Sequence, residues 1–191
     1  MKIGILGGTF NPIHTGHLVL AQECWYALGL EKVLFVPASL PPHKEVEGGV
    51  SAADRLSMVK MALGHDPRFE ISTYELDKGG ISYTVDTLRH FHKVYGAQTD
   101  LFFIAGADAA GGLSTWREPD EVLKIATLVV VSRPGHRCVD DHGGKIKRIQ
   151  MPSLDISSSL IRKRIEEKAP IDFLVPAPVV AYIRDKGFYR V

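Results

Sequence analysis

Residues 2–17 read KIGILGGTFNPIHTGH, and this stretch decides the fold class. The short apolar run from Lys2 to Leu6 predicts a strand that ends at Gly7-Gly8, and a helix is predicted from His17 to Leu28. Glycines at such a junction let backbone N–H groups approach an anion closely, because no Cβ stands in the way. The helix start near Gly16 adds orphan N–H groups and the positive end of the helix dipole. The stretch therefore predicts a phosphate site where a strand runs into a helix.

The rest of the chain alternates apolar runs with helical patterns. Further strands are predicted at 32–36, 69–72, 100–105, 127–132 and 145–151, and further helices at 53–63, 84–95, 119–125, 158–168 and 176–186. Apolar strands separated by helices favour an α/β fold with a doubly wound, Rossmann-like parallel sheet that carries helices on both faces. We expect one domain spanning 1–191. In such sheets ligands bind beyond the carboxyl ends of the strands, near the switch point of the strand order.

The overall composition limits the classes of partner. The 191 residues carry a formal net charge of +1, which argues against a non-specific nucleic-acid binder. The apolar runs are too short for a membrane span, and no signal-peptide pattern opens the sequence. Cys24 and Cys138 are too few for a disulfide framework. We therefore expect a cytoplasmic protein that binds neither nucleic acid nor membrane.

Two histidines give the first loop its predicted chemistry. His14 and His17 lie three residues apart at the helix entry, where imidazoles donate hydrogen bonds to phosphate oxygens. The loop lacks the third glycine of a dinucleotide fingerprint and the Gly-Lys-Ser/Thr ending of a P-loop. Neither a dehydrogenase nor a P-loop NTPase is favoured. The plain alternative is that the glycines only form a turn and that the histidines lie on the surface.

The string GGTFNPIHTGHL resembles the HxGH signature loop of the nucleotidyltransferase superfamily. Its longer form, with Gly-Gly-Thr-Phe-Asn-Pro, is similar to that of the nicotinate-nucleotide adenylyltransferases. The resemblance implies a fold of the nucleotidyltransferase type and places the ATP phosphates on His14 and His17. It also implies contacts to ATP from the loop residues Gly7, Gly8, Thr9 and Phe10.

A second signature opens the penultimate helix. Residues 155–162 read DISSSLIR, and serines at a helix start are expected as caps. A helix N-terminus with an arginine nearby also forms an anion site. The string is similar to the family's ISSTxIR motif, which implies that Ser158 and Arg162 bind ATP phosphates. It departs from the motif at two positions, where Ser159 replaces threonine and Leu160 replaces a polar residue. The C-terminal helices, from about 156 to 191, would thus complete the ATP site.

Four further residues are assigned to the phosphates and the adenosine. Pro41-Pro42-His43-Lys44 resembles the family's PPHK segment, which implies that Lys44 contacts the mononucleotide phosphate. Gly106 and Asp108 follow an apolar strand and match the family's GxD motif at the adenosine, although an Asx turn or a helix cap is the structural alternative. Arg133 is expected to stack on adenine, because a guanidinium plane stacks on aromatic rings.

Two segments are expected to select the pyridine ring. Ser82-Tyr83-Thr84 matches the family's SYT segment, which holds the base. Trp116 lies in a polar stretch, where an aromatic face can stack on a flat pyridine. Backbone N–H groups near Thr84 and near Trp116-Arg117 are candidates to face the nicotinate carboxylate.

These residues predict an enzyme that transfers AMP from ATP to nicotinate mononucleotide, giving deamido-NAD and pyrophosphate. The catalytic residues would be His14, His17, Lys44 and Arg162, and Mg²⁺ would enter with ATP, because no carboxylate cluster is built to hold it. The substrates, ATP and nicotinate mononucleotide, are the expected partners, and a homo-oligomer stays open.

Three alternatives remain at this point. One is a related adenylyl- or cytidylyltransferase acting on another phosphate, and a second is a non-catalytic nucleotide-binding sensor. The third is a zinc protein, suggested by His136, Cys138 and His142, although these three residues lack a fourth ligand.

Overall fold

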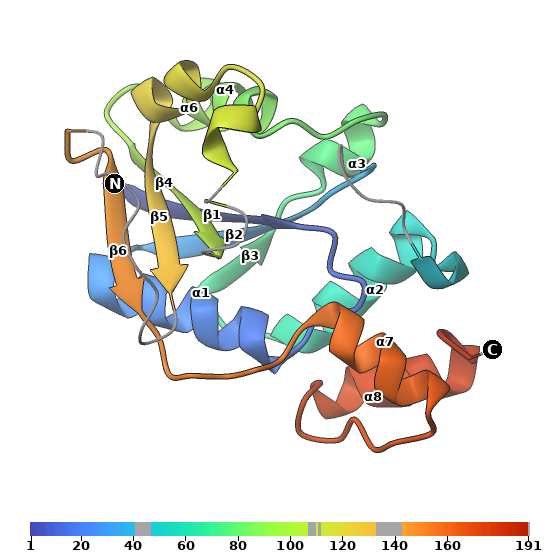
Figure 1. Cartoon of the computed structure of the whole chain (residues 1–191). Helices are drawn as coiled ribbons and strands as arrows, with labels where there is room; N and C mark the ends of the chain where they lie inside the picture. The colour runs from blue at the N-terminus through green and yellow to red at the C-terminus, as the bar shows by residue number, and fades with distance from the viewer. Residues whose placement is uncertain (41–46, 107–109, 111, 133–142, 191) are drawn as a thin grey trace.

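Six parallel strands form one sheet in the order β3-β2-β1-β4-β5-β6 (Figure 1). This computed structural model describes residues 1–40, 47–106, 110, 112–132 and 143–190. The order is that of a classical doubly wound nucleotide-binding sheet, as the sequence predicts. The strands are β1 (Lys2–Gly8), β2 (Lys32–Pro37), β3 (Phe69–Ile71), β4 (Asp100–Gly106), β5 (Ala126–Ser132) and β6 (Ile146–Gln150).

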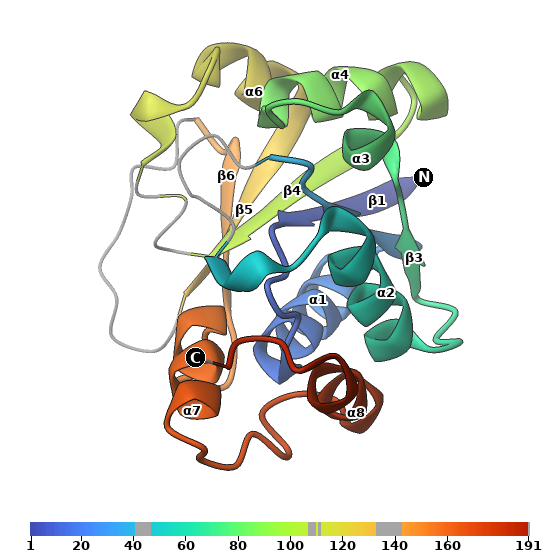
Figure 2. The same cartoon turned by 90° about the vertical axis from the view of Figure 1, so that its right-hand side faces the viewer.

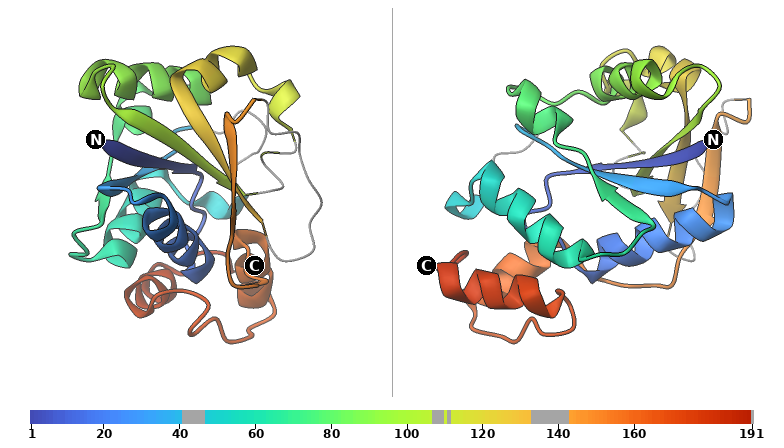
Figure 3. Two further views of the ribbon diagram at one scale, coloured as in Figure 1. Left: turned by 90° about the vertical axis from the view of Figure 1, so that its left-hand side faces the viewer. Right: turned by 180° about the vertical axis from the view of Figure 1, so that it is seen from behind.

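Helices cover both faces of the sheet (Figure 3). One face carries α1 (Thr15–Leu28) and α2 (Ala52–Leu63), with α7 (Ser158–Glu166) and α8 (Ala177–Lys186) packed beyond them. The other face carries α4 (Thr84–Tyr95) and α6 (Pro119–Ile125), and the short α3 (Tyr74–Lys78) contacts β2. Two 3₁₀ turns, η1 (Glu47–Gly49) and η2 (Leu113–Thr115), precede α2 and α6.

The central strands bury alternate side chains in two separate cores. On β4, Phe102 and Ile104 enter the core under α1 and α2, whereas Leu101 and Phe103 enter the core under α4 and α6. Side chains on a strand alternate between the faces, so a strand that is covered on both sides must be apolar throughout. This double burial explains why continuous apolar runs predict the fold correctly.

The predicted elements are confirmed, with small shifts at their ends. Helix α1 begins at Thr15 rather than at His17, because His14 takes the extended backbone conformation of an N-cap. Helix α3 is not predicted, because its five residues are too few to show a helical period. In the described segments, no helix combines the length and the apolar character that a membrane crossing requires.

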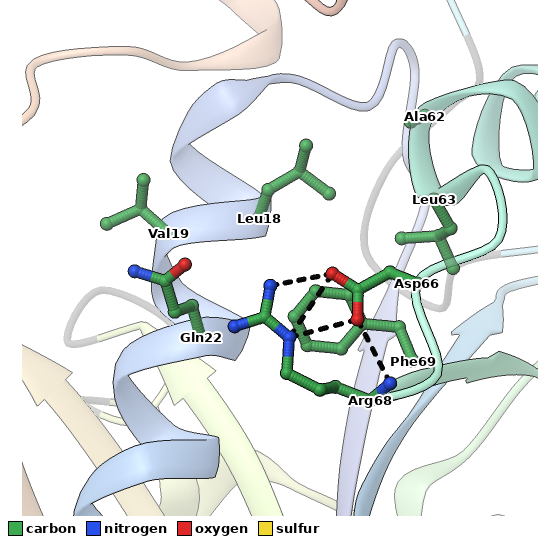
Figure 4. Close-up of a pocket in the computed structure, with 8 residues that line it drawn as sticks. All are labelled: Leu18, Val19, Gln22, Ala62, Leu63, Asp66, Arg68 and Phe69. Atoms are coloured by element: carbon green, nitrogen blue, oxygen red, sulfur yellow. Dashed lines mark hydrogen bonds and ion pairs between the residues drawn. The ribbon is translucent and has the colours of Figure 1, made fainter.

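A shallow pocket opens between α1 and the chain that leads from α2 into β3 (Figure 4). Asp66 and Arg68 face each other there, with Arg68 Nη2 2.6 Å from Asp66 Oδ2. The Arg68 guanidinium also lies over the rings of Trp25 and Phe69. The charges in this pocket are thus paired with each other, and its lining residues include none of the predicted site residues: Leu18, Val19, Gln22, Ala62, Leu63, Asp66, Arg68 and Phe69.

Candidate active site

The glycine loop lies where the strand order changes direction. The chain passes from β1 outward to β2 and β3, and then crosses back to β4 on the other side of β1. Strands β1 and β4 run in register, with Leu6 beside Ile104, so Gly7-Gly8 and Gly106 reach the same edge of the sheet. Such a switch point leaves a crevice beyond the carboxyl ends of the two strands. The fold therefore brings these predicted glycines together.

The two histidines of the loop stack on each other. The ring centroids of His14 and His17 are 3.8 Å apart, with 30° between the ring planes. The backbone N–H of His14 donates to Nδ1 of His17 at 3.2 Å, so the proton of the neutral His17 ring is on Nε2. The Phe10 ring meets the His17 ring edge to face, with centroids 5.1 Å apart. The alternative of surface histidines does not hold for His14, which is buried and whose ring contacts that of the half-buried His17.

Burial keeps both imidazoles neutral in the free protein. It lowers the pKa of His14 to about 4, and burial with the neighbouring His14 lowers the pKa of His17 well below its usual value. A neutral ring donates through one N–H, and a nearby anion then favours the charged form. The pair is suited to bind negative charge while staying uncharged without it.

The position between the two histidines leaves little room for a side chain, which explains why it is a glycine, Gly16. A Cβ on Gly16 would lie 3.0 Å from Nδ1 and 3.1 Å from Cε1 of His14. Such contacts are tighter than nearly all real Cβ contacts, so a side chain at this position would displace the His14 ring. The signature His-x-Gly-His thus follows from the packing of its first ring.

Residues of the second signature form hydrogen bonds to the backbone of the first signature loop. The Ser158 hydroxyl donates to the carbonyl of Pro12 at 2.9 Å, and Nη1 of Arg162 donates to the carbonyl of Asn11 at 2.9 Å. The neighbouring Ser157 caps α7 by accepting from the N–H of Leu160. The structure therefore brings Ser158 and Arg162 onto the glycine–histidine loop, as their shared assignment to ATP requires. In the free protein both side chains bind the loop backbone.

The start of α1 is less open than the sequence predicts. The N–H of Thr15 donates to the carbonyl of Leu174, in the segment between α7 and α8, and the N–H of His17 donates to the carbonyl of His14. Two N–H groups of the first turn are therefore already paired. Any phosphate bound here depends more on the histidine rings and less on the helix end.

The residues predicted to bind the pyridine ring gather on the other face of the sheet. The Arg117 guanidinium lies 4.8 Å from the centroid of the Tyr83 ring, and Trp116 meets Phe103 of β4 edge to face at 5.7 Å. Thr84 begins α4, and the Ser82 hydroxyl accepts from the N–H of Ser39, just after β2. The two predicted segments thus come together from distant parts of the sequence.

Lys44, Asp108 and Arg133 lie outside the described residues, and so do His136, Cys138 and His142 of the zinc alternative. Within the described ranges, no group of three His, Cys, Asp or Glu side chains has the arrangement of a metal site. Cys24 is buried in α1, where its pKa is raised to about 12, first by burial and then by Glu23. It belongs to the core.

Comparisons with known proteins agree with this geometry. Residues 5–164 match the profile of the cytidylyltransferase-like family. A protein of Thermoanaerobacter sp. (strain X514), named "Probable nicotinate-nucleotide adenylyltransferase", is 41% identical over 200 residues, covering 100% of this chain and 95% of its own. A protein of the same name from Halalkalibacterium halodurans is 42% identical over 190 residues, with 99% and 91% covered. The chain belongs to the nicotinate-nucleotide adenylyltransferase family.

Solved structures with much lower sequence identity share the fold of this chain. The Plasmodium falciparum nicotinic acid mononucleotide adenylyltransferase complexed with NaAD superimposes with a TM-score of 0.79 at 20% identity, covering 98% of this chain and 97% of that one. The same enzyme complexed with APC gives a TM-score of 0.76 at 18% identity, with 98% and 96% covered. The expected fold class and family are both confirmed.

Sequence reasoning missed the buried polar residues that support this adenylyltransferase site. Nη1 of Arg55 donates to the carbonyl of Thr9 at 2.7 Å, and Nη2 donates to the carbonyl of Ser39 at 3.0 Å. Arg55 is 1% exposed, and one signal for it was available. It shares the apolar face of α2 with Met58 and Val59, where an arginine is out of place unless it is paired.

Proposed function

We propose that the His14–His17 pair holds the phosphates of ATP while this adenylyltransferase joins AMP to nicotinate mononucleotide. In the reaction, a 5′-phosphate oxygen of the mononucleotide attacks the α-phosphorus of ATP. One P–O bond forms, the bond between the α-phosphorus and the bridging oxygen to the β-phosphorus breaks, and pyrophosphate leaves. The products are deamido-NAD and pyrophosphate.

One observation carries the assignment: two neutral, stacked imidazoles stand at the carboxyl end of β1, at the switch point of the sheet. Transfer of this kind needs alignment and charge stabilisation, with little covalent work by the protein. His17, with its proton on Nε2, is suited to donate to a phosphate oxygen as charge builds on the leaving group. The pair meets that need without a nucleophile.

The remaining contacts are proposed on the same basis. Gly7, Gly8, Thr9 and Phe10 would line the triphosphate, with Gly106 and Asp108 at the adenosine and Arg133 on adenine. Ser158 and Arg162 hold the loop from behind and would also contact the ATP phosphates. On the opposite side, Ser82, Tyr83, Thr84, Trp116 and Arg117 would receive nicotinate, and Lys44 would receive the phosphate of the mononucleotide.

The divalent cation is assigned to the substrate. Mg²⁺ prefers oxygen ligands and commonly keeps waters and substrate phosphates around it. In the described part of the chain, no cluster of three carboxylate or imidazole groups offers a cage, so Mg²⁺ bound to ATP fits the donors that are present. The charge balance and the two cysteines support the cytosol as the location.

Replacement of His17 tests the role of the pair. We expect His17→Ala to lower the rate of pyrophosphate release with ATP and nicotinate mononucleotide more than about tenfold, a loss of about 1.4 kcal/mol or more. The matched control is His65→Ala, an exposed histidine after α2. A loss smaller than about tenfold in the His17 variant would remove the phosphate role.

Substrate competition separates the rivals. Pyrophosphate release is measured with ATP and, in turn, nicotinate mononucleotide, nicotinamide mononucleotide and phosphopantetheine. Preference for phosphopantetheine would favour the other transferases of the superfamily. ATP binding without pyrophosphate release from any of the three would favour a sensor.

A further inference from the structure

The C-terminal end of the chain reaches the histidine loop. The hydroxyl of Tyr189 donates to Oδ1 of Asn11 at 2.7 Å, across 178 residues of sequence. Tyr189 is 5% exposed and Asn11 is 4% exposed, so the hydrogen bond is shielded from water. A shielded bond to a neutral amide leaves a costly unpaired oxygen when its donor is removed. Asn11 directly follows Phe10, whose ring contacts His17.

Unusual backbone angles surround this contact. Tyr189 has a φ of +62° and Phe10 a φ of +49°, in the left-handed region that side chains other than glycine rarely adopt. Gly48 has a φ of +79°, and a Cβ there would lie 2.6 Å from Cδ1 of Tyr189. Strained residues persist only where their surroundings hold them, and they gather at functional sites. Here they stand on both sides of the Tyr189–Asn11 hydrogen bond.

The route of the chain explains how Tyr189 arrives there. Helix α8 ends at Gly187, whose left-handed conformation turns the chain, and the N–H of Phe188 then donates back to the carbonyl of Ile183. Figure 2 shows the C-terminal segment returning from α8 toward α7. Burial raises the pKa of Tyr189, so its hydroxyl keeps the donated proton.

Asn11 is held at two atoms. Its backbone carbonyl accepts from Arg162 and its side-chain oxygen accepts from Tyr189. Helix α7 and the segment after α8 therefore both form hydrogen bonds to this residue. The carbonyls of Thr9 and Pro12 on either side accept from Arg55 and Ser158. The contact from Tyr189 reaches a side chain of the loop, whereas those from Arg162, Arg55 and Ser158 reach backbone carbonyls.

We propose that Tyr189 is a positioning residue for catalysis: its hydroxyl fixes Asn11, and through it the Phe10 turn against which His17 packs. The proposal rests on the proposed function, because it takes the His14–His17 pair to be the group that binds the phosphates. It predicts that the hydroxyl of Tyr189 affects the chemical step more than it affects pyridine binding.

The test compares two tyrosines of the C-terminal segment, one in α8 and one after it. Tyr189→Phe removes only the hydroxyl and keeps the ring. The control Tyr182→Phe removes a similar hydrogen bond, from Tyr182 of α8 to Oδ1 of Asp54 on α2 at 2.9 Å, which does not involve the loop. We expect kcat to fall about tenfold in Tyr189→Phe alone, with the KM for nicotinate mononucleotide within about twofold of the wild-type value. An equal kcat in the two variants would overturn the proposal.

Two further measurements tie the effect to Asn11 and to the rings. In a double-mutant cycle, Asn11→Ser with Tyr189→Phe should be no slower than Asn11→Ser alone, and additive losses would show that Tyr189 acts elsewhere.

NMR of the imidazole nitrogens should show His17 signals shifted by Tyr189→Phe and unmoved by Tyr182→Phe. Unmoved signals in both variants would contradict positioning. The NMR measurement needs no turnover, so a wild-type chain inactive on the mononucleotide would overturn the proposed function while the proposal about Tyr189 is still decided.

Discussion

At the scale of single residues, the site depends on polar groups that the fold keeps out of water. His14 and His17 are neutral because they are buried, and a neutral pair tolerates stacking at 3.8 Å. Two charged rings at that distance would repel each other. On the proposed function, the enzyme would bind its anionic substrate with two groups that become charged only when the substrate is near.

This arrangement links folding stability to pH through His14. Its pKa is about 4 in the folded chain and 6.5 in the unfolded one, so the unfolded chain binds more protons between these values. Stability consequently falls as pH drops below 6.5, by about 2 kcal/mol from this residue at pH 5. His14→Asn, which keeps a good N-cap residue, should remove that part of the loss. Urea denaturation at pH 8 and pH 5 measures it, and a wild-type-to-variant difference that is constant with pH would contradict it.

The carboxyl of Glu75 makes folding stability depend on pH in the opposite direction. Burial raises the pKa of this α3 carboxyl, against the lowering effect of hydrogen bonds from the Thr87 and Ser82 hydroxyls. A raised pKa in the folded state gives stability that is present at low pH and lost as pH rises through that pKa. We expect Glu75→Gln to be at least as stable as the wild type at pH 7 and to lose that advantage near pH 4. Thermal unfolding at the two pH values checks this, and a variant clearly less stable at pH 7 would refute it.

At the scale of elements, Arg55 connects the loops that follow β1 and β2. Its two terminal nitrogens donate to the carbonyls of Thr9 and Ser39, which a planar fork can bridge and a single ammonium cannot. We expect Arg55→Lys to lower the free energy of unfolding by about 2 kcal/mol, the scale of a hydrogen bond to a charged group. Urea unfolding measures the loss. Arg89→Lys, at the exposed ion pair with Glu118, is the control and should cost less than about 1 kcal/mol.

The strands and helices could be predicted because their burial shows in the local pattern of apolar residues. The runs at 32–36 and 100–105 are apolar throughout, and both are covered on two faces. The contacts of Arg55, Glu75 and Tyr189 were not predictable in the same way. Arg55 and Tyr189 reach distant parts of the sequence, and Glu75 reaches the start of the next helix. In all three cases a polar side chain carries no periodic signal that identifies its partner. The signature loops were recognisable, but the way they hold each other follows only from the folded arrangement.

At the scale of the whole molecule, the C-terminal helices share the core on one face of the sheet. Ile161 of α7 and Val179, Val180 and Ile183 of α8 are buried in the cluster that contains Phe35. Two signatures about 150 residues apart meet because this core brings α7 onto the loop after β1. This packing supports a single domain spanning 1–191.

Removal of residues 156–191 tests whether the chain folds as a single cooperative unit. Burial of four aliphatic side chains contributes about 6–12 kcal/mol, as much as the whole stability of a typical domain. We therefore expect the full chain to unfold in one cooperative transition by calorimetry and the shortened chain to show none, because its exposed core face leaves no stable remainder. Removal of residues 190 and 191 alone, beyond Tyr189, is the matched control and should keep the transition. A shortened chain that still unfolds cooperatively near the full-length midpoint would make the C-terminal helices a separate unit, and the meeting of the two signatures a docking event between folded parts.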